Sequence, residues 1–237
     1  MQTSYLVVDI GNTHLKFAFF EANEICMKGI GLENLQLELQ TRPYSYSIIA
    51  SVGNKEITNQ VMSLLENPII AHNQLKLPIT LDYDTPHTLG VDRLANAIAI
   101  HTLAKGKPAL AVDAGTCLKF DFVNQEGIYM GGSIGPGLHM RFKAMHAFTA
   151  NLPLIETWSK KELIGKSTKG SMVSGALIGM EHEIKTTIQR YQSQYKDLMI
   201  FMTGGDLKYF DLELKNPIFA LENLTLLGLK LILEENV

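Results

Sequence analysis

One short pattern occurs twice in this chain: an apolar strand with Asp near its end, a turn with Gly and Thr, and a second apolar strand. Asp9 and Asp113 lie one residue before the ends of the two leading strands, and the tripeptide Leu-Lys-Phe follows each turn, at Leu15–Phe17 and Leu118–Phe120. The two aspartates lie nearly half of the 237 residues apart. Solenoid repeats are shorter and more numerous, so this spacing predicts a duplicated domain.

The remaining patterns alternate between strand and helix periodicity, which predicts an α/β fold of two lobes. The lobe boundary is expected near Gly106–Pro108, giving lobes of residues 1–107 and 108–237. Strands are expected at Tyr5–Ile10, Leu15–Phe20, Ser47–Ser51, Ala109–Ala114, Cys117–Val123 and Leu198–Met202. Helices are expected at 56–65, from Asp92 onward, and at 138–148, 169–192 and 224–233.

Composition narrows the class of protein. A net charge of −3 and no Lys/Arg run give no field for capturing nucleic acid, so no nucleic-acid partner is expected. Two cysteines are too few for a disulfide framework. The chain starts without a basic leader and holds no apolar run of about 18 residues, so we expect a cytoplasmic protein with no membrane partner.

The two Asp-containing tips are the first candidate site. An Asp-x-Gly turn at a strand end places a carboxylate beside backbone amides that can approach and donate to phosphate. Lys16 adds a positive charge, as ATP chemistry requires. A single such turn is more often only a turn, but two copies after apolar strands favour a clamp for a triphosphate.

Two glycine-rich segments are weaker candidates. Thr203–Asp206 follows an apolar strand, where glycines let adenine or ribose lie against the backbone, and a plain turn fits equally well. Gly131–Gly137 precedes a helix and could accept an anion or serve only as a tight crossover. The segment 72–89 has little pattern and could face a substrate.

Familiar alternatives fail. Gly165–Ser167 resembles the end of a Walker loop, but the upstream glycine is replaced by Lys160. His139 and His146 would share a helix face without a third ligand, so a metal site of histidines is not expected.

Taken together, the motifs resemble the type III pantothenate kinase family over nearly the whole chain. The resemblance implies an actin-like ATPase fold of two ribonuclease-H-like lobes with a nucleotide cleft between them. It also implies transfer of the γ-phosphoryl group of ATP to pantothenate in coenzyme A biosynthesis, by a homodimer that uses Mg²⁺ and a monovalent cation, K⁺ or NH₄⁺. The motifs that carry it are Asp9–Thr13, Gly90–Arg93, Asp113–Thr116, Gly131–Gly137, Gly165–Thr168 and Thr203–Asp206.

The resemblance also implies roles for single residues at the nucleotide. Asp9 would organise Mg²⁺ through water, and Asp113 would be a ligand of the monovalent cation. Thr116 would donate to phosphate, and the adenosine side would be formed by Gly204 and Gly205. The first phosphate loop would comprise Asp9, Ile10, Gly11, Asn12, Thr13, His14, Leu15 and Lys16.

For the acceptor, the resemblance implies that Asp92 takes the hydroxyl proton of pantothenate. Arg93 would either hold pantothenate or keep Asp92 ionised. Without the surrounding motifs, Asp92 and Arg93 would be read as an ordinary helix start with a surface arginine. The residues expected to hold the substrate are Tyr83, Gly90, Val91, Asp92, Arg93 and Thr168.

Two positions depart from the family pattern. Lys119 stands where the family usually has Thr, which puts the monovalent cation in question, and Ser167 stands where it usually has Asn. An ammonium pointing at Asp113 would replace K⁺ or weaken its binding. Two other functions stay open: another kinase or phosphatase of the same superfamily, and a non-catalytic regulatory homologue.

Overall fold

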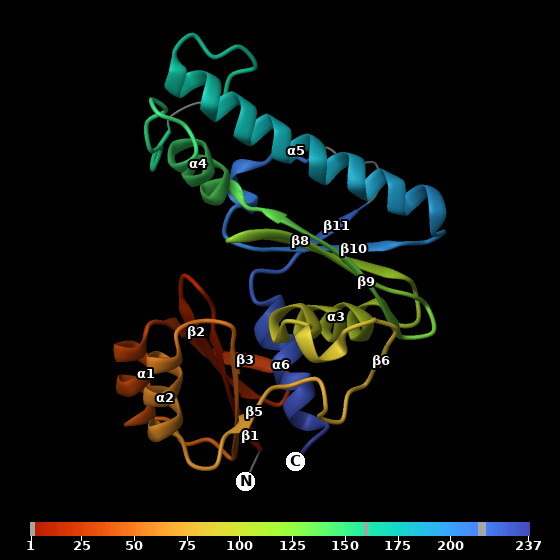
Figure 1. Ribbon diagram of the computed structural model, residues 1–237. Coiled ribbons are helices and arrows are strands. Elements are labelled where there is room, and N and C mark those ends of the chain that lie inside the picture. Colours follow the sequence, from red (N-terminus) through yellow and green to blue (C-terminus); the bar gives the residue numbers. More distant parts are fainter. Residues whose placement is uncertain (1–2, 159–160, 213–216) are drawn as a thin grey trace. The chain divides into compact units, whose positions relative to one another are not determined.

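The computed structural model describes residues 3–158, 161–212 and 217–237 and divides into two compact units (Figure 1). Unit 1 contains Met1–Gly106, Glu126–Met130 and Asn223–Val237. Unit 2 contains Lys107–Gln125 and Gly131–Glu222. The chain therefore leaves the first unit at the expected boundary and returns to it twice.

Unit 1 is built on a five-stranded sheet in the order β3-β2-β1-β4-β5. The first three strands form an antiparallel meander, and β1, β4 and β5 run parallel. The strands are β1 (Ser4–Ile10), β2 (Leu15–Glu21), β3 (Glu24–Ile30), β4 (Tyr46–Ser51) and β5 (Ile69–Ile70).

Helices cover both faces of this sheet, which is why β1 and β4 are almost continuously apolar. Leu35 of α1 and Val61 of α2 pack with Leu6, Val8 and Ile49 on one face. On the other face α3 and α6 contact the central strands. The helices are α1 (Leu32–Leu39), α2 (Lys55–Leu64), α3 (Val91–Ala104) and α6 (Leu224–Glu234).

The C-terminal helix α6 packs closely on α3. An ideal Cβ on Gly228 would lie 1.8 Å from the carbonyl oxygen of Ala95, so only glycine fits there. Thr225 also donates to the Asn96 side chain across the same contact, at 2.9 Å. Lys230 is fully buried, and its ammonium contacts Asn23 and the Tyr5 ring. The helix is thus an integral part of unit 1.

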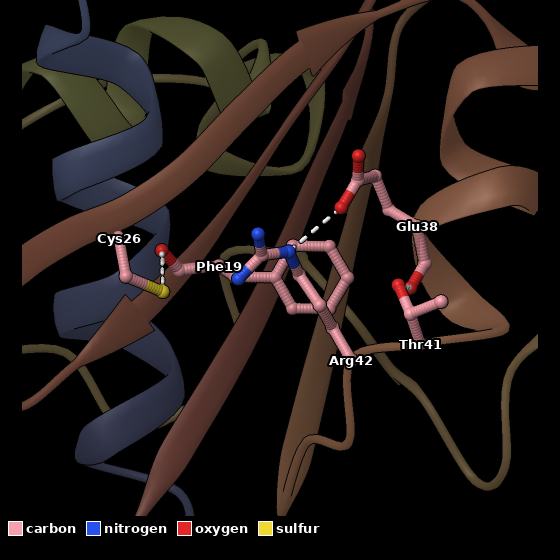
Figure 2. A network of polar contacts seen from close by, with 5 residues as sticks. All are labelled: Phe19, Cys26, Glu38, Thr41 and Arg42. Atoms are coloured by element: carbon pink, nitrogen blue, oxygen red, sulfur yellow. Dashed lines mark hydrogen bonds and ion pairs between the residues drawn. The ribbon is translucent and has the colours of Figure 1, made fainter.

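Local polar contacts occur at the end of helix α1 and between strands β2 and β3 (Figure 2). Arg42 pairs with Glu38 at 2.7 Å, and the Thr41 hydroxyl donates to the Glu38 carbonyl at 3.4 Å. On the neighbouring strands, the Cys26 thiol donates to the Phe19 carbonyl at 3.3 Å. Cys26 is an exposed free thiol, and Cys117 is a half-buried one.

A short pair of parallel strands in unit 1 includes part of the weakly patterned segment 72–89. Strand β6 (Thr80–Leu81) runs parallel to the first residues of β9 (Ile128–Pro136). The Tyr83 and Tyr129 rings then contact each other with centroids 5.8 Å apart. The segment ends in the short helix η1 (Pro86–Thr88), directly before α3.

Unit 2 contains most of a six-stranded sheet in the order β11-β10-β7-β8-β9-β6. Its last strand, β6, pairs with the part of β9 that belongs to unit 1. Strands β7 and β8 are antiparallel, and β7, β10 and β11 are parallel. Helices α4 and α5 lie over one face (Figure 1), where Phe142, Val173 and Leu177 pack with Leu110 and Phe120. The elements are β7 (Ala109–Ala114), β8 (Cys117–Val123), β10 (Met199–Thr203), β11 (Ile218–Ala220), α4 (Leu138–Ala147), α5 (Thr168–Gln194) and the short helix η2 (Leu207–Tyr209).

The two sheets share one topology, which confirms the duplicated α/β fold. In each sheet a central strand, β1 or β7, has an antiparallel partner on one side, β2 or β8, and two parallel strands on the other, β4 and β5 or β10 and β11. The second sheet also carries β6 beyond β9. The domain limits differ from the expected 1–107 and 108–237, because Glu126–Met130 and Asn223–Val237 belong to unit 1. Helix periodicity predicts an apolar face for α6, but it does not say which sheet that face covers.

No helix in the described ranges is both long and apolar enough to cross a membrane.

Candidate active site

The first tip joins β1 to β2. Asp9 lies opposite Lys16 in the antiparallel register, and the Gly11 amide donates to the His14 carbonyl at 3.0 Å, which closes the turn. Asn12 and Thr13 between them are exposed. A carboxylate, a lysine and a turn of exposed polar groups therefore lie at one loop.

The loop after β4 supports this tip from the side. An ideal Cβ on Gly53 would lie 2.4 Å from the Gly11 carbonyl oxygen, so the two backbones approach more closely than a side chain would allow. The Val52 amide donates to the Ile10 carbonyl at 3.0 Å. Gly53 was not among the expected site residues, since its role depends on parallel pairing of β1 with β4.

The second tip joins β7 to β8 and repeats this arrangement. Asp113 lies opposite Lys119 in the register, and the Lys119 ammonium is 2.7 Å from the Asp113 carboxylate. The Gly115 amide donates to the Cys117 carbonyl at 3.1 Å, while Thr116 is exposed. Each tip thus holds an acid and a lysine on facing strands.

The start of α4 is fixed to this second tip. The Gly137 amide donates to the Thr116 carbonyl at 3.2 Å. An ideal Cβ on Gly137 would lie 2.1 Å from the Gly115 carbonyl oxygen, so a side chain there would displace the loop. The Gly131–Gly137 segment therefore acts at least as a tight crossover, one of its two possible interpretations.

The turn after β10 lies against the same tip. Gly204 has φ of +103°, and an ideal Cβ on it would lie 2.2 Å from the Ala114 carbonyl oxygen. The Asp206 amide donates to that carbonyl at 2.9 Å. Parallel pairing also sets Thr203 beside Asp113. Gly204 is thus required by both conformation and close approach, and Gly205 is exposed next to it.

Asp206 brings a further acid to this edge of unit 2. Burial raises the pKa of the Asp206 carboxyl above its ordinary value, and the negative charge of Asp113 acts in the same direction. The positive charges of His139 and Lys208 and a hydrogen bond from the Leu138 backbone oppose the rise. Asp206 and His139 were not among the expected site residues, although Asp206 ends its Thr-Gly-Gly-Asp motif. Lys119 was expected only as a departure that could affect the cation at Asp113.

The start of α3 carries the expected acceptor residues. Gly90 is the N-cap, Asp92 lies in the first turn and is partly exposed, and Arg93 is buried. An ideal Cβ on Gly90 would lie 2.6 Å from a carboxylate oxygen of Asp92, so the absence of a side chain makes room for this carboxylate. A helix N-terminus favours a negative charge there. Tyr83 lies before the short helix η1, which directly precedes α3.

Thr168 is the first residue of α5, in unit 2. Ser167 caps this helix by accepting a hydrogen bond from the Gly170 amide at 3.0 Å. Ser and Asn are both strong N-caps. The departure from the family pattern at position 167 therefore preserves the cap that positions Thr168.

The residues at the first tip fit Mg²⁺, whereas those at the second tip fit a monovalent cation less well. The described residues contain no cluster of three or more His, Cys, Asp or Glu side chains suited to a metal ion. Mg²⁺ usually needs only one or two carboxylates because substrate phosphates and water complete its shell, and Asp9 offers one such group. At Asp113, by contrast, a carboxylate oxygen already contacts the Lys119 ammonium.

Solved structures share this fold. A Campylobacter jejuni protein described as a Baf family transcriptional activator aligns with a TM-score of 0.64 at 20% identity, over 98% of both chains. An inorganic polyphosphate/ATP-glucomannokinase from Arthrobacter aligns with a TM-score of 0.50 at 12% identity, again over 98% of both chains. With the duplicated sheets and their Asp-bearing tips, these likenesses define the actin-like ATPase fold.

Sequence comparison is more specific. Residues 5–190 match the family described as type III pantothenate kinase. Type III pantothenate kinases of Christiangramia forsetii and Cytophaga hutchinsonii are 42% and 38% identical over 98% of this chain, and the match covers 98% and 99% of those proteins. The chain belongs to the type III pantothenate kinase family. Its activity is accordingly that of a kinase, which phosphorylates pantothenate with ATP in coenzyme A biosynthesis.

Proposed function

We propose that the two tips bind one ATP and that the start of α3 presents pantothenate to its γ-phosphate. The observation that carries this proposal is the repeated tip, with Asp9 facing Lys16 and Asp113 facing Lys119 in the same strand register. The sequence predicts that both tips bind one nucleotide in a cleft between the lobes, and this stays a prediction.

The first tip would hold the phosphates. Its residues from Asp9 to Lys16 offer exposed polar side chains and backbone amides at one turn, and Lys16 offers a positive charge. Mg²⁺, when bound, neutralises the charge that builds up on the transferred phosphoryl group. Asp9 would hold this ion through water, since one carboxylate is enough beside the phosphates.

The second tip would hold the same nucleotide from unit 2. Thr116 is exposed at its turn and can donate a hydroxyl hydrogen bond to phosphate. Gly204 and Gly205 lie at the turn packed against this tip and would let the adenosine approach the backbone.

Asp92 would serve as the base. The primary hydroxyl oxygen of pantothenate forms a bond to the γ-phosphorus, the bond from that phosphorus to the β,γ-bridging oxygen breaks, and ADP leaves. The hydroxyl proton passes to the Asp92 carboxylate. A loose transition state depends more on position and charge than on early proton removal, so a weak base such as Asp is sufficient.

The surroundings of Asp92 suit this role. Gly90 leaves space for its carboxylate, and the helix N-terminus favours the ionised form. Arg93 is buried next to it in sequence and can hold pantothenate or keep Asp92 ionised. Val91, Tyr83 and, from unit 2, Thr168 would complete the substrate contacts.

We further propose that the kinase is a cytoplasmic homodimer. The three most exposed large apolar side chains among the described residues belong to unit 2: Phe148, Leu163 and Ile164, with 88%, 78% and 72% of their surfaces exposed. Exposed apolar side chains mark a surface that a partner covers when they form one contiguous patch. Sedimentation of the purified protein at several concentrations would show a dimer, and a monomer throughout would refute this part.

An acceptor panel tests the proposed function. ADP release would be coupled to a spectroscopic signal with pantothenate, pantetheine, glycerol and several hexoses as acceptors. We expect turnover with pantothenate to exceed every other acceptor. Equal or greater turnover with a sugar would favour another kinase of this fold, and ATP hydrolysis that no acceptor stimulates would contradict the acceptor assignment.

A further inference from the structure

The Asp113–Lys119 pair is a largely buried ion pair, not a surface one. The two residues face each other across β7 and β8, and the ammonium lies 2.7 Å from the carboxylate. Only 12% and 13% of the two side-chain surfaces are exposed. A pair this well shielded from water is screened little by salt, so each charge depends on the other.

A second acid, Asp206, lies near the pair, beside a loop that would receive phosphate. Asp206 lies close enough to Asp113 for the two negative charges to interact. An ideal Cβ on Gly115 would lie 3.3 Å from an Asp113 carboxylate oxygen, so this carboxylate lies beside the turn of the tip. A positive charge at this point lowers the cost of bringing an anionic nucleotide to the tip.

A monovalent cation fits poorly beside this pair. To bind Asp113, K⁺ or NH₄⁺ would have to approach the carboxylate that the Lys119 ammonium already contacts. Two unit positive charges a few ångströms apart repel strongly where water is largely excluded. The residues present therefore disagree with the cation site that the sequence resemblance implies for Asp113.

The first tip has a lysine opposite its aspartate in the same way, so this pairing occurs in both copies of the repeat. Lys16 holds the same register position opposite Asp9 that Lys119 holds opposite Asp113. Both lysines are the middle residue of a Leu-Lys-Phe tripeptide. Each half of the molecule thus carries its own lysine at the acid of its tip.

We propose that the Lys119 ammonium takes the place of a monovalent cation at the second tip, so that this kinase needs neither K⁺ nor NH₄⁺. The inference rests on the proposed function in that the second tip binds the ATP. It assigns Lys119 as a positioning residue for Asp113 and the nucleotide.

Two measurements on the whole protein test this. Pantothenate-dependent ADP release would be compared in KCl, NH₄Cl and tetramethylammonium chloride at equal ionic strength, and binding of a non-hydrolysable ATP analogue would be measured by calorimetry in the same salts. We expect rates and dissociation constants that agree within about twofold, because all three salts screen alike. Stimulation of about tenfold or more by K⁺, in either measurement, would overturn the proposal.

Lys119→Thr supplies the complementary test. Removing the ammonium leaves Asp113 as a shielded charge, so in tetramethylammonium we expect about tenfold weaker binding of the analogue, with K⁺ or NH₄⁺ restoring most of it. Lys196→Thr, at an exposed lysine of the same unit, is the matched control and should not respond to the salt. Binding by Lys119→Thr that equals the wild type in every salt would contradict the proposal.

The two proposals fail in different ways. If no salt supports pantothenate phosphorylation, the acceptor assignment is wrong, and the calorimetry still decides about Lys119. If Lys119→Thr does not fold, the comparison of salts on the unaltered protein remains decisive.

Discussion

Gly90 and Asp92 are linked by space: an ideal Cβ on Gly90 would lie 2.6 Å from a carboxylate oxygen of Asp92. The backbone at Gly90, with φ of −60° and ψ of 133°, suits any residue. The glycine is therefore required by the position of the Asp92 side chain and not by the turn. A substitution at Gly90 should therefore disturb the proposed base, Asp92, without disturbing the fold.

We predict that Gly90→Ala lowers activity much more than stability. The new methyl group would force the Asp92 carboxylate into another rotamer, and a misplacement of about 1 Å can cost about a hundredfold in rate. The unfolding free energy should change by less than about 1 kcal/mol, because only a side-chain end has to move. Steady-state kinetics and urea unfolding measure the two quantities.

Gly175→Ala provides a control for that variant. Gly175 is exposed on α5, and its Cβ would have no atom within 4 Å. We expect unchanged kinetics and a stability equal to or slightly above that of the wild type. A Gly90→Ala enzyme with wild-type kinetics would show that the position of Asp92 does not limit the reaction.

Gly228→Ala should act on the fold. The added methyl group would lie 1.8 Å from the Ala95 carbonyl oxygen, so backbone has to move and α6 has to shift away from α3. Overpacking of this kind costs about 1–3 kcal/mol. Urea unfolding monitored by circular dichroism would measure the loss, with Gly179→Ala on α5 as a helix control that meets no atom within 4 Å. Equal stability of the two variants would contradict the close packing of α6.

Asp206→Asn should change how stability depends on pH. The pKa of Asp206 is raised in the folded protein, with burial as the largest cause, so the folded state prefers the protonated carboxyl. Its contribution to stability is complete below the ordinary value of 3.8 and is lost as the pH rises through the folded pKa. Asn stays neutral and can still accept a hydrogen bond from the Leu138 amide.

The stability of Asp206→Asn relative to wild type should therefore increase from pH 3.5 upward and level off above the raised pKa. Urea unfolding at steps of half a pH unit between about 3.5 and 7 would show this. A difference between the two proteins that does not vary with pH would mean that Asp206 titrates alike in the folded and unfolded chain.

Much of the fold could be predicted because its strongest signals are local. The strands that lead into Asp9 and Asp113 are apolar on both faces, so their burial is visible without knowledge of their neighbours. The repeated tip then indicates duplication. Strands such as β3, whose exposed and half-buried residues alternate, carry a weaker signal and were not predicted.

What could not be predicted depends on contacts between distant segments. The place of α6 in unit 1 follows from the fit of Gly228 on Ala95, which no helix pattern reveals. Asp206 reaches the second tip only because β10 pairs with β7. Lys119 was noticed as a departure from the family pattern, but its contact with Asp113 required the register of the β7–β8 hairpin.

The most direct test of the account is the rate of pantothenate-dependent ADP release by Asp92→Asn. Loss of the base should lower kcat by about a hundredfold or more, while analogue binding and urea unfolding stay close to wild type. A variant that folds, binds the nucleotide and phosphorylates pantothenate at nearly the wild-type rate would contradict the assignment of Asp92 as the proton acceptor.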